Sequence, residues 1–397
     1  MGRLEGDADA VTGVDVDSRR IRPGDLFVAV SGGESFLADA RGRGAAATLV
    51  PDDAHAALAA IGGAVRARSD ARVVAITGSI GKTSTKDILA ALLRSRLRAV
   101  AAPDGYNNEV GLPLTLCRIE PETEVVVTEM AMRGPGQIRD LARTARPDLG
   151  VITSIAPVHL ELLGSLENIA RAKAELLGEL PAGAVAVLPE DAPELEPFVP
   201  DGLDVRRFAP PQAELRDGRT HIVWHGRDVV FGFAARHQAT NAAAALTAAD
   251  ALGVPPPEEP VTVEFSRLRS QESVLSGGGL LINDAWNANP VAMRAALAHL
   301  LERADGRRTV AVLGDMAELG PEGPRYHEEV GREAEKVDVV LGVGELSRHY
   351  SPDEWAPTAA DAVALALALV RPGDAILVKG SRSVGLEVVA EALGAAG

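Results

Sequence analysis

VVAITGSIGKTSTKDI, residues 73–88, joins a β-prone run, a glycine-rich loop and the start of a helical pattern. The run 73–77 predicts a strand, and helical periodicity begins at Ser84. Between them, Gly78 and Gly81 let backbone N–H groups approach an anion, while the helix start directs unpaired N–H groups and the positive end of its dipole toward the same place. This order of elements predicts a phosphate-binding loop.

Two side chains of this loop complete the predicted nucleotide site. Lys82 is expected to reach the β- and γ-phosphates of a nucleotide, and the Thr83 hydroxyl is expected to bind Mg²⁺. Ile76 stands where the general P-loop pattern, Gly-x4-Gly-Lys-[Ser/Thr], has its first glycine, and a purely structural turn is the alternative. The flanking strand and helix favour nucleotide binding, with contacts expected from Gly78, Ser79, Ile80, Gly81, Lys82, Thr83 and Ser84.

Composition limits the class of protein. A chain of 397 residues has room for two or three domains, and its 46% hydrophobic and 24% charged residues are ordinary for a globular protein. The formal net charge of −16 argues against nucleic acid as a general partner. The single cysteine, Cys117, excludes a disulfide framework and a multi-cysteine zinc site, and a small buried hydrophobe is its simplest interpretation.

The sequence shows no targeting or membrane-spanning pattern. Its first residues, MGRLEGDADAV, contain no basic region followed by an apolar run. No later segment is long and apolar enough to span a bilayer. We therefore expect a cytoplasmic protein without membrane insertion, and we expect it to be a monomer.

Strands and helices alternate along most of the chain, which predicts an α/β protein. Residues 1–72 predict a small α/β domain with strands at 26–30 and 44–50. Residues 73–254 predict a mostly parallel sheet covered on both faces, with β-hairpin material at its edge over 206–233. The proline-rich segment GVPPPEEP, residues 253–260, marks the boundary to a Rossmann-like domain over 255–397.

The elements expected in the two larger domains follow from the same alternation. In the central domain we predict strands at 125–130, 150–155, 184–188 and 226–231, helices at 137–144 and 166–180, and an Ala-rich helix after residue 235. In the last domain we predict strands at 280–284, 309–313, 339–343 and 375–378, helices at 291–302, 325–335 and 359–370, and a closing helix.

Ionisable side chains stand near the ends of two predicted central strands. Glu129 ends the apolar run VVVTE, and His159 follows the strand VITSI by a few residues. Ligands bind at the carboxyl ends of strands in open α/β sheets, so both residues are candidates for holding a metal. A capped turn is the alternative explanation for either residue alone.

Lys173 lies on the apolar face of a predicted helix. It stands seven residues after Leu166 and seven before Leu180, on the stripe that also contains Ile169, Ala170 and Leu177. A snorkelling stem or an ion pair with Glu129 is the structural alternative. The functional alternative is a desolvated, neutral amine that reacts with CO₂ to give an anionic carbamate able to bind a metal.

Polar residues also follow three strands of the last domain, at 284–290, 314–316 and 379–382. An ordinary capped turn explains any one of them, but three such ends at one edge of a sheet favour a site. In the first domain, Asp17, Ser18 and Arg19 form either a polar turn or an anion contact, and the residues alone do not decide between the two.

Several blocks in order give the chain a family resemblance. TGSIGKTSTKD, YNNEVGLPLTL, TEMAMRGPGQI, TSIAPVHLELLGSLENIARAKAELL and ARHQATNAA resemble the Mur ligase family over nearly the full length. NDAWNANP, LGDMAELG and KGSR resemble the branch that adds D-alanyl-D-alanine to UDP-N-acetylmuramoyl-tripeptide. The resemblance implies a nucleotide-sugar substrate domain at 1–72, an ATP-binding domain at 73–254, and a C-terminal domain at 255–397 that swings in to complete the site.

The resemblance also implies residue roles. It implies Lys82 on the ATP phosphates, Thr83 and Glu129 on one Mg²⁺, and His159 with carbamylated Lys173 on a second, which makes Lys82, His159 and Lys173 the catalytic set. The remaining implied contacts are Asn241 with adenine, Asp284 and Asn287 with the nucleotide, Lys379 and Arg382 with the incoming dipeptide, Ser18 and Arg19 with the UDP moiety, and Asn107 and Asn108 with substrate.

The implied reaction is an ATP-dependent amide ligation of small-molecule substrates. A carboxylate is a poor electrophile, so ATP first converts it to an acyl phosphate, which the amine of D-Ala-D-Ala then attacks. Three departures from the family leave room for a Mur-like ligase that joins a different acid and amine. The first domain lacks an Asp-Gly-His-containing stretch after Ser35, Trp286 replaces a tyrosine, and Pro189 replaces an asparagine.

Two readings from other classes compete with a ligase. A P-loop switch or motor predicts neither a lysine on a buried stripe nor a further domain with polar strand ends, and the chain has no Asn-Lys-x-Asp motif. A catalytically dead binding protein is disfavoured because Lys82, Glu129, His159 and Lys173 are all present.

Overall fold

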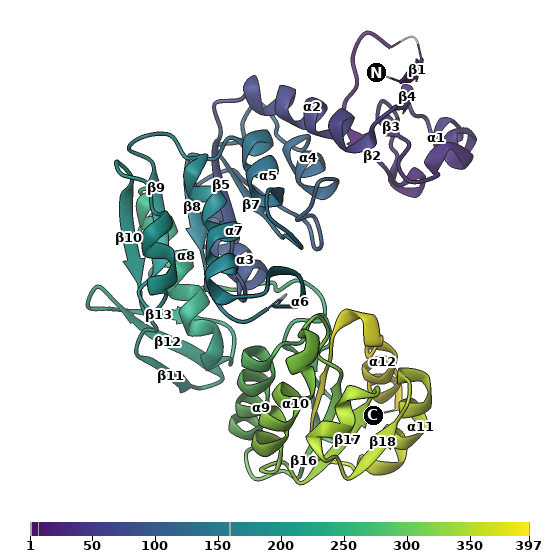
Figure 1. Cartoon of the computed structure of the whole chain (residues 1–397), viewed down its shortest axis with the longest axis vertical. Coiled ribbons are helices and arrows are strands. Elements are labelled where there is room, and N and C mark those ends of the chain that lie inside the picture. The colour runs from purple at the N-terminus through teal and green to yellow at the C-terminus, as the bar shows by residue number, and fades with distance from the viewer. Residues whose placement is uncertain (1, 7, 159, 397) are drawn as a thin grey trace.

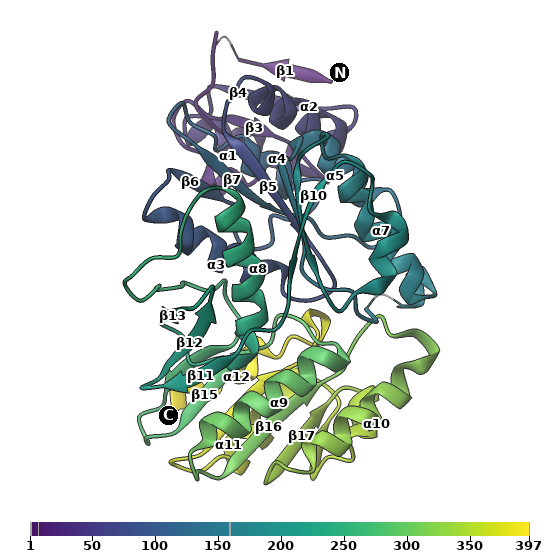
Figure 2. The same ribbon diagram turned by 90° about the vertical axis from the view of Figure 1, so that its left-hand side faces the viewer.

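The computed structural model describes residues 2–6, 8–158 and 160–396, so His159 lies outside the described residues. The chain is an α/β protein, which confirms the predicted fold class. Figures 1 and 2 show the central part of the chain between the first part and the C-terminal part. Each part is built around its own sheet.

The first part is the small α/β unit expected from the sequence. Its four strands have the order β1-β4-β3-β2, with β1 antiparallel to β4 and the other pairs parallel. The expected strand at 26–30 ends two residues early. The bounds are β1 Arg3–Glu5, β2 Val14–Asp15, β3 Leu26–Val28, β4 Ala47–Val50, α1 Leu37–Gly42, α2 Ala54–Ala67 and the 3₁₀ turns η1 Ser18–Arg20 and η2 Gly33–Phe36.

The central part is a six-stranded parallel sheet of order β10-β9-β8-β5-β7-β6. Its strands are β5 Arg72–Thr77, β6 Ala99–Ala101, β7 Val125–Glu129, β8 Leu149–Ile152, β9 Val185–Pro189 and β10 Asp204–Phe208. Its helices are α3 Lys82–Arg94, α4 Gly111–Leu116, α5 Gln137–Ala145, α6 Leu160–Leu163, α7 Leu166–Gly178 and α8 Ala239–Ala251.

Alternate residues of β5 explain how this sheet is covered. Val74 and Ile76 pack with α3 and α8, whereas Val73 and Ala75 pack with α4, α5 and α7 on the opposite face. Successive side chains of a strand point to opposite faces, so an unbroken apolar strand needs helices on both sides. β5, which is buried from Val73 to Thr77, therefore places the loop that follows it at the edge of a rigid core.

The hairpin material predicted at 206–233 is present over most of that range, but it begins later than predicted. Residues 206–233 were expected to form hairpin material, but β10 pairs in parallel with β9 and extends the main sheet. The proline pair at 210–211 separates β10 from the next strand and prevents a tight hairpin turn there. The hairpin strands begin later, as β11 Ala213–Arg216, β12 Arg219–Trp224 and β13 Arg227–Phe231, and form a separate antiparallel sheet.

The proline-rich segment leads into a stretch that still packs on the central part. Phe231 and Val261 form an isolated bridge, and Val263 and Phe265 lie against the core cluster that contains α3 and α8. The Ser266 N–H donates to the Asp87 side chain at 2.8 Å. The chain therefore leaves the central core after about residue 265, and the boundary drawn at 254 and 255 stays a prediction.

The C-terminal part has a six-stranded sheet of order β14-β15-β19-β16-β17-β18, parallel except for β14. The Rossmann-like alternation was predicted, but the exposed edge strand β14 and the three-residue edge strand β18 were missed because neither shows a buried apolar pattern. The bounds are β14 Gln271–Val274, β15 Leu280–Asp284, β16 Thr309–Gly314, β17 Val339–Val343, β18 Glu354–Ala356, β19 Ala375–Lys379, α9 Pro290–Ala304, α10 Gly323–Ala334, α11 Ala359–Leu369 and α12 Glu387–Ala396.

Helices α9 and α10 cover one face of this sheet, and α11 and α12 cover the other. The strands β15, β19 and β16 are neighbours, so the three polar strand ends predicted to share an edge do share it. Across the part of the chain that the structure describes, no helix is both long and apolar enough to cross a bilayer.

Candidate active site

A cleft of about 990 Å³ separates the carboxyl-terminal strand ends of the central part from those of the C-terminal part. The loop after β5, the end of β7 and the start of α8 line its central side. The polar ends of β15 and β19 line the other side. The predicted nucleotide and dipeptide residues are thus brought to one cavity, whose lining includes Lys82, Glu129, Asn241, Asp284, Asn287, Lys379 and Arg382.

The two loop glycines are required by close packing. Gly78 and Gly81 have φ angles of +146° and +86°, which side-chain-bearing residues rarely adopt. A Cβ atom on Gly78 would lie 2.0 Å from the Thr153 hydroxyl oxygen, and one on Gly81 would lie 2.1 Å from the Asn241 Oδ1. The close approach of Gly81 sets the Asn241 side chain directly beside the phosphate loop.

Backbone hydrogen bonds fix the shape of this loop. The N–H groups of Ser79 and Ile80 donate to the Ser154 carbonyl and hydroxyl oxygens, each at 2.9 Å. The N–H groups of Lys82 and Thr83 lie in the first turn of α3, where helix geometry supplies no intrahelical acceptor. The donors directed at an anion are therefore those of the helix start.

Lys82 folds back over the loop. Its Nζ donates to the carbonyl oxygens of Gly78 and Ser79 at 2.8 and 3.4 Å. Burial lowers the pKa of this ammonium group, the carboxylate of Glu129 opposes that shift, and the charge of Arg269 adds to it. Two carbonyl acceptors are a weak hold on a cation, so Lys82 is available to an anionic ligand.

Glu129 ends β7 with its carboxylate inside the site, where the residue is only 4% exposed. Burial raises its pKa, but the charges of Arg269 and Lys82 and hydrogen bonds from Asn107 and Thr83 outweigh that effect and leave the pKa below its ordinary value. The Asn107 amide donates to Glu129 Oε1 at 2.8 Å. The carboxylate and the Thr83 hydroxyl therefore place two hydrogen-bonded oxygen-bearing groups next to each other in the site.

Lys173 is buried on α7, as its position on the apolar stripe predicted, with 2% of its surface exposed. Burial and the charge of Lys82 hold its pKa well below the ordinary lysine value. Among the described residues Lys173 forms no ion pair or hydrogen bond. The snorkelling stem and the ion pair with Glu129 are therefore both wrong, because the amine reaches neither solvent nor that carboxylate.

Conventional metal ligands are sparse around this edge. Within residues 2–6, 8–158 and 160–396, no group of three or more His, Cys, Asp or Glu side chains is arranged to hold a metal ion. Mg²⁺ usually keeps several waters and binds one or two carboxylates together with phosphate oxygens. The Thr83 and Glu129 oxygens fit that mode of binding, whereas the predicted contribution of His159 lies outside the described residues.

The strand ends of the C-terminal part converge on one lysine. Lys379 Nζ forms an ion pair with Asp284 Oδ2 at 2.6 Å and donates to the Asn287 carbonyl oxygen at 2.8 Å. The Lys379 side chain is buried. These three residues thus form one rigid polar unit at the rim of the cleft, and the charge of Lys379 is already balanced by Asp284.

The Trp286 ring lies near two arginines in the same cleft. The Arg269 and Arg382 guanidinium groups lie 5.6 and 5.5 Å from its ring centroid. Arg382 also forms an ion pair with Glu387 at 2.6 Å and is half exposed. The tryptophan ring therefore holds both cations toward the cleft.

Arg269 is a site residue that sequence reasoning missed. It lines the cleft, its charge affects both Lys82 and Glu129, and its buried Nε has no hydrogen-bond partner among the described residues. The residue lies in an irregular stretch before β14, where periodicity gives no signal. An unpaired buried guanidinium atom beside Lys82 indicates a second cation for an anionic ligand.

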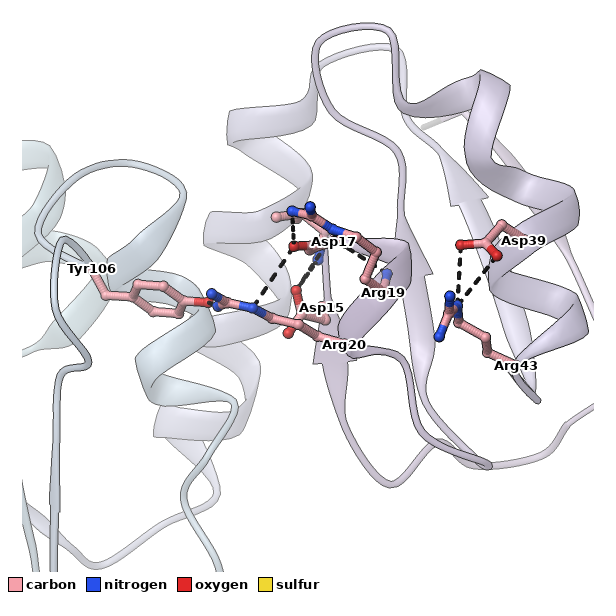
Figure 3. Close-up of polar contacts among 8 residues, drawn as sticks. Asp15, Asp17, Arg19, Arg20, Asp39, Arg43 and Tyr106 are labelled. Carbon is pink, nitrogen blue, oxygen red and sulfur yellow. Dashed lines mark hydrogen bonds and ion pairs between the residues drawn. The ribbon is translucent and has the colours of Figure 1, made fainter. Parts of the chain in front are cut away.

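The turn that contains Ser18 and Arg19 lies in the first part of the chain, and Figure 3 shows Arg19 there beside Asp17. Neither Ser18 nor Arg19 is among the residues that line the cleft. Asp17 caps η1 by accepting from the Arg19 N–H, and it also pairs with the Arg19 guanidinium at 2.8 Å. The bond from the Arg19 side chain lowers the pKa of Asp17 to about 2. Ser18 is buried and donates to Asp39. The turn is therefore ordered, with the Arg19 head in solvent.

The chain belongs to the Mur ligase family: residues 76–249 match the Mur ligase middle domain, and residues 267–382 match the Mur ligase glutamate ligase domain. The UDP-N-acetylmuramoyl-tripeptide–D-alanyl-D-alanine ligase of Mycobacterium tuberculosis is 34% identical, over 96% of this chain and 92% of that protein. Crystal structure I of MurF from Acinetobacter baumannii has a TM-score of 0.86 and 26% identity, over 99% of this chain and 96% of that one.

MurF ligase from Thermotoga maritima, whose structure was solved in complex with ADP, has a TM-score of 0.84 and 27% identity, over 98% of this chain and 99% of that one. These similarities extend through all three parts of the chain. They confirm the family that the ordered sequence blocks indicated.

Proposed function

We propose that this protein is an ATP-dependent peptide ligase that joins D-alanyl-D-alanine to UDP-N-acetylmuramoyl-tripeptide, in the synthesis of peptidoglycan precursors. The observation that carries the proposal is the cleft in which the phosphate loop with Lys82 and Glu129 faces the Asp284–Lys379 pair. Relatives over the full length bear the name of this ligase. The fold thus brings a phosphoryl-transfer edge and a second polar edge to one cavity.

ATP fits the central side of the cleft. The start of α3 offers backbone N–H groups to phosphate, and Lys82 and Arg269 supply two cations for the triphosphate. We propose that Asn241, which lies beside Gly81, contacts the adenine. Asp284 and Asn287 lie across the cleft, where they would meet the rest of the nucleotide when the C-terminal part closes.

Mg²⁺ fits the oxygen pair of Thr83 and Glu129. The low pKa of Glu129 keeps its carboxylate charged, which a hard divalent cation requires. When bound there, Mg²⁺ offsets negative charge on the phosphates. Asn107 orients the carboxylate from the opposite side through its 2.8 Å hydrogen bond.

Carbamylated Lys173 is part of the proposal. A neutral buried amine reacts with CO₂, whereas a protonated lysine at this position would face the charge of Lys82 without an anionic partner in the described chain. The carbamate replaces that repulsion with an attraction to Lys82 and provides oxygen ligands for a second Mg²⁺, with His159 as the other proposed ligand.

The reaction follows from these placements. A carboxylate oxygen of the tripeptide forms a bond to the γ-phosphorus of ATP, ADP leaves, and the product is an acyl phosphate. The dipeptide nitrogen then bonds to the carbonyl carbon, loses a proton, and phosphate departs. Lys82 and Arg269 stabilise charge during phosphoryl transfer, and enclosure of the cleft holds the reactants in line and excludes water.

The residues proposed to bind the dipeptide and the UDP-linked tripeptide lie in different places. Arg382, half exposed at the rim, is suited to the carboxylate of the dipeptide, and Lys379 helps to hold that rim. Asn107 and Asn108 line the cleft where the tripeptide carboxylate would arrive. Ser18 and Arg19 are proposed to contact the UDP moiety at the other end of that substrate.

A second candidate is a Mur-like ligase for a different acid and amine. One observation favours it: η2 runs straight into α1, without the stretch that the family usually has after Ser35. Incubation of the protein with ATP, Mg²⁺, D-Ala-D-Ala and UDP-N-acetylmuramoyl-tripeptide tests the first proposal, which expects the pentapeptide product by mass together with ADP. Release of ADP only with other acids or amines would support the second candidate instead.

A further inference from the structure

A side-chain hydrogen bond joins the first part of the chain to the loop between β6 and α4, whose residue Asn107 contacts Glu129. Arg20 Nη1 donates to the Tyr106 hydroxyl at 2.7 Å, between residues that are 86 positions apart (Figure 3). Arg20 ends η1, directly after Ser18 and Arg19. Tyr106 directly precedes Asn107 and Asn108. The bond therefore connects the residues next to both proposed ends of the acid substrate.

Tyr106 is held firmly at its backbone and at its ring. Its N–H donates to the Pro103 carbonyl oxygen at 3.1 Å, and its ring packs against the apolar cluster of the first sheet, which contains Leu26 and Val28. A Cβ atom on Gly111 would lie 2.3 Å from the Tyr106 Cα, so the start of α4 comes very close to it. Because Tyr106 is rigidly placed, a displacement of its hydroxyl is expected to displace its backbone as well.

The next residue connects this tyrosine to the catalytic edge. Asn107 donates from its amide to Glu129 Oε1 at 2.8 Å, and its carbonyl oxygen accepts the Ala131 N–H at 2.8 Å. Asn107 is therefore bound both to the last residue of β7 and to the segment that follows this strand. A shift of Tyr106 moves Asn107, and with it the carboxylate of Glu129.

The other end of the bond is equally ordered. Arg20 Nε lies 3.8 Å from Asp17 Oδ2, and Asp17 is in turn fixed because its N–H donates to Asp15 Oδ1 at 2.9 Å. The Arg20 side chain remains 58% exposed, so burial contributes little to holding its guanidinium in place. The Tyr106 hydroxyl and the Asp17 carboxylate together fix its direction.

We propose that Arg20 and Tyr106 are a positioning pair that sets the first-part turn at the correct distance from Asn107 and Glu129. The inference rests on the proposed function, in which one long substrate spans these two places. Both residues act through their neighbours and do not touch the reacting atoms. Because the substrate carboxylate must be aligned with the γ-phosphate, a loose turn weakens the productive alignment of the acid substrate and leaves ATP binding unchanged.

Tyr106→Phe is the sharpest variant, because it removes the hydroxyl and keeps the packed ring. We expect kcat/KM for the UDP-linked tripeptide to fall about fivefold to tenfold, as for loss of one typical solvent-exposed hydrogen bond, with KM for ATP unchanged. Arg20→Ala is expected to give a similar loss. The double variant Arg20→Ala/Tyr106→Phe is expected to be no worse than either single variant, because both remove the same interaction.

Arg66→Ala is the matched control. Arg66 also joins a helix of the first part to the central part, through Nε to the Ala145 carbonyl oxygen at 3.1 Å and Nη2 to Asp148 Oδ2 at 2.9 Å. Its side-chain hydrogen bonds within the described residues go to Ser69, Ala145, Arg146 and Asp148, and so to neither the 106–108 loop nor the turn at 17–20. We expect it to lower the melting temperature and leave kcat/KM for the UDP-linked tripeptide unchanged.

The outcomes separate this inference from the proposed function. If the wild-type protein ligates and Tyr106→Phe has wild-type kcat/KM for the tripeptide, the positioning role is wrong. Additive losses in the double variant, or equal losses in the ATP and tripeptide parameters, would also overturn it. A wild-type protein that forms no pentapeptide would instead overturn the proposed function, and this inference with it.

Discussion

The phosphate edge of the central part, meaning the loop at 78–83 together with Glu129, differs in burial from the turn at 17–20 of the first part. At the phosphate edge Thr83 and Glu129 are 3% and 4% exposed, and two glycines are fixed by contacts that admit no Cβ atom. In the turn, the Arg19 side chain is 80% exposed and pairs with Asp17. The comparison teaches that the proposed chemistry has an enclosed, rigid setting, whereas the proposed contact with the UDP end of the substrate lies on a solvated surface.

This difference predicts how substitutions rank. Removing a charge at the enclosed edge affects a group in a low-dielectric, water-poor site, so its effect on the transition state is large. Removing a charge from the solvated turn changes a screened interaction, so its effect is small and falls mainly on substrate binding. The four predictions that follow run from the largest effect to the smallest.

Lys82→Ala is expected to lower ligation by at least about a thousandfold, because the loop lysine offsets charge on the transferring phosphoryl group. ADP release measured with both substrates checks this, and circular dichroism checks that the fold is kept. Lys336→Ala is the control, since Lys336 forms only an exposed pair with Glu333 on the surface. Near-normal turnover in folded Lys82→Ala would contradict the expectation that charges at the enclosed edge matter more for the reaction than charges in the solvated turn.

Lys173→Ala is expected to lose about a hundredfold or more, and added formate or acetate is expected to restore part of the activity by filling the vacated anion site. Lys173→Arg is expected to stay inactive with formate, because the guanidinium remains charged, cannot be carbamylated and occupies the space. ADP release across a formate titration is the measurement. Full activity of Lys173→Ala without added acid would mean that the buried lysine is structural.

Arg269→Ala is expected to lose about tenfold to a hundredfold in kcat, because a second cation beside Lys82 is removed. Arg269→Lys is expected to recover part of the rate, since the charge returns without the planar guanidinium. Arg267→Ala, two residues earlier and outside the cleft lining, is the control. If both Arg269→Ala and Arg267→Ala retain wild-type kcat, Arg269 does not act as a second cation in phosphoryl transfer.

Arg19→Ala is expected to have the smallest effect, a rise of about twofold to fivefold in KM for the UDP-linked tripeptide with kcat unchanged. The reason is that the exposed guanidinium has only a screened interaction to lose. Arg3→Ala, which breaks the exposed pair of Arg3 with Glu5, is the control from the same part of the chain. A loss in kcat as large as that of Arg269→Ala would show that the turn is not a mere recognition surface.

The same contrast explains what the sequence could predict. The phosphate loop was predictable because a buried strand, the loop glycines and a helix start each leave a local sequence pattern. The burial of Lys173 was predictable because a charged residue on an otherwise apolar helix face stands out from the periodic pattern. Ser18 and Arg19 gained a role only through resemblance, since an exposed polar turn has no distinctive pattern. The family and three-part fold followed from the ordered blocks and are confirmed.

The rest depended on tertiary contacts that sequence periodicity does not encode. Arg269 lies in an irregular stretch and acquires its role only when the C-terminal part faces the phosphate loop. The start of the predicted hairpin region, residues 206–208, belongs instead to β10, because the partner strand β9 is reached by a crossover and not by a local turn. The link from Arg20 to Tyr106 spans two parts of the chain, so no local pattern announces it.

The central claim is that the enclosed edge activates a carboxylate as an acyl phosphate. The most direct test uses UDP-N-acetylmuramoyl-tripeptide labelled with ¹⁸O in both oxygens of the reacting carboxylate, with ATP, Mg²⁺ and D-Ala-D-Ala. Mass spectrometry of the released phosphate is predicted to find one ¹⁸O atom per phosphate, because one carboxylate oxygen bonds to the γ-phosphorus and leaves with it. Pentapeptide formed with unlabelled phosphate would contradict the account.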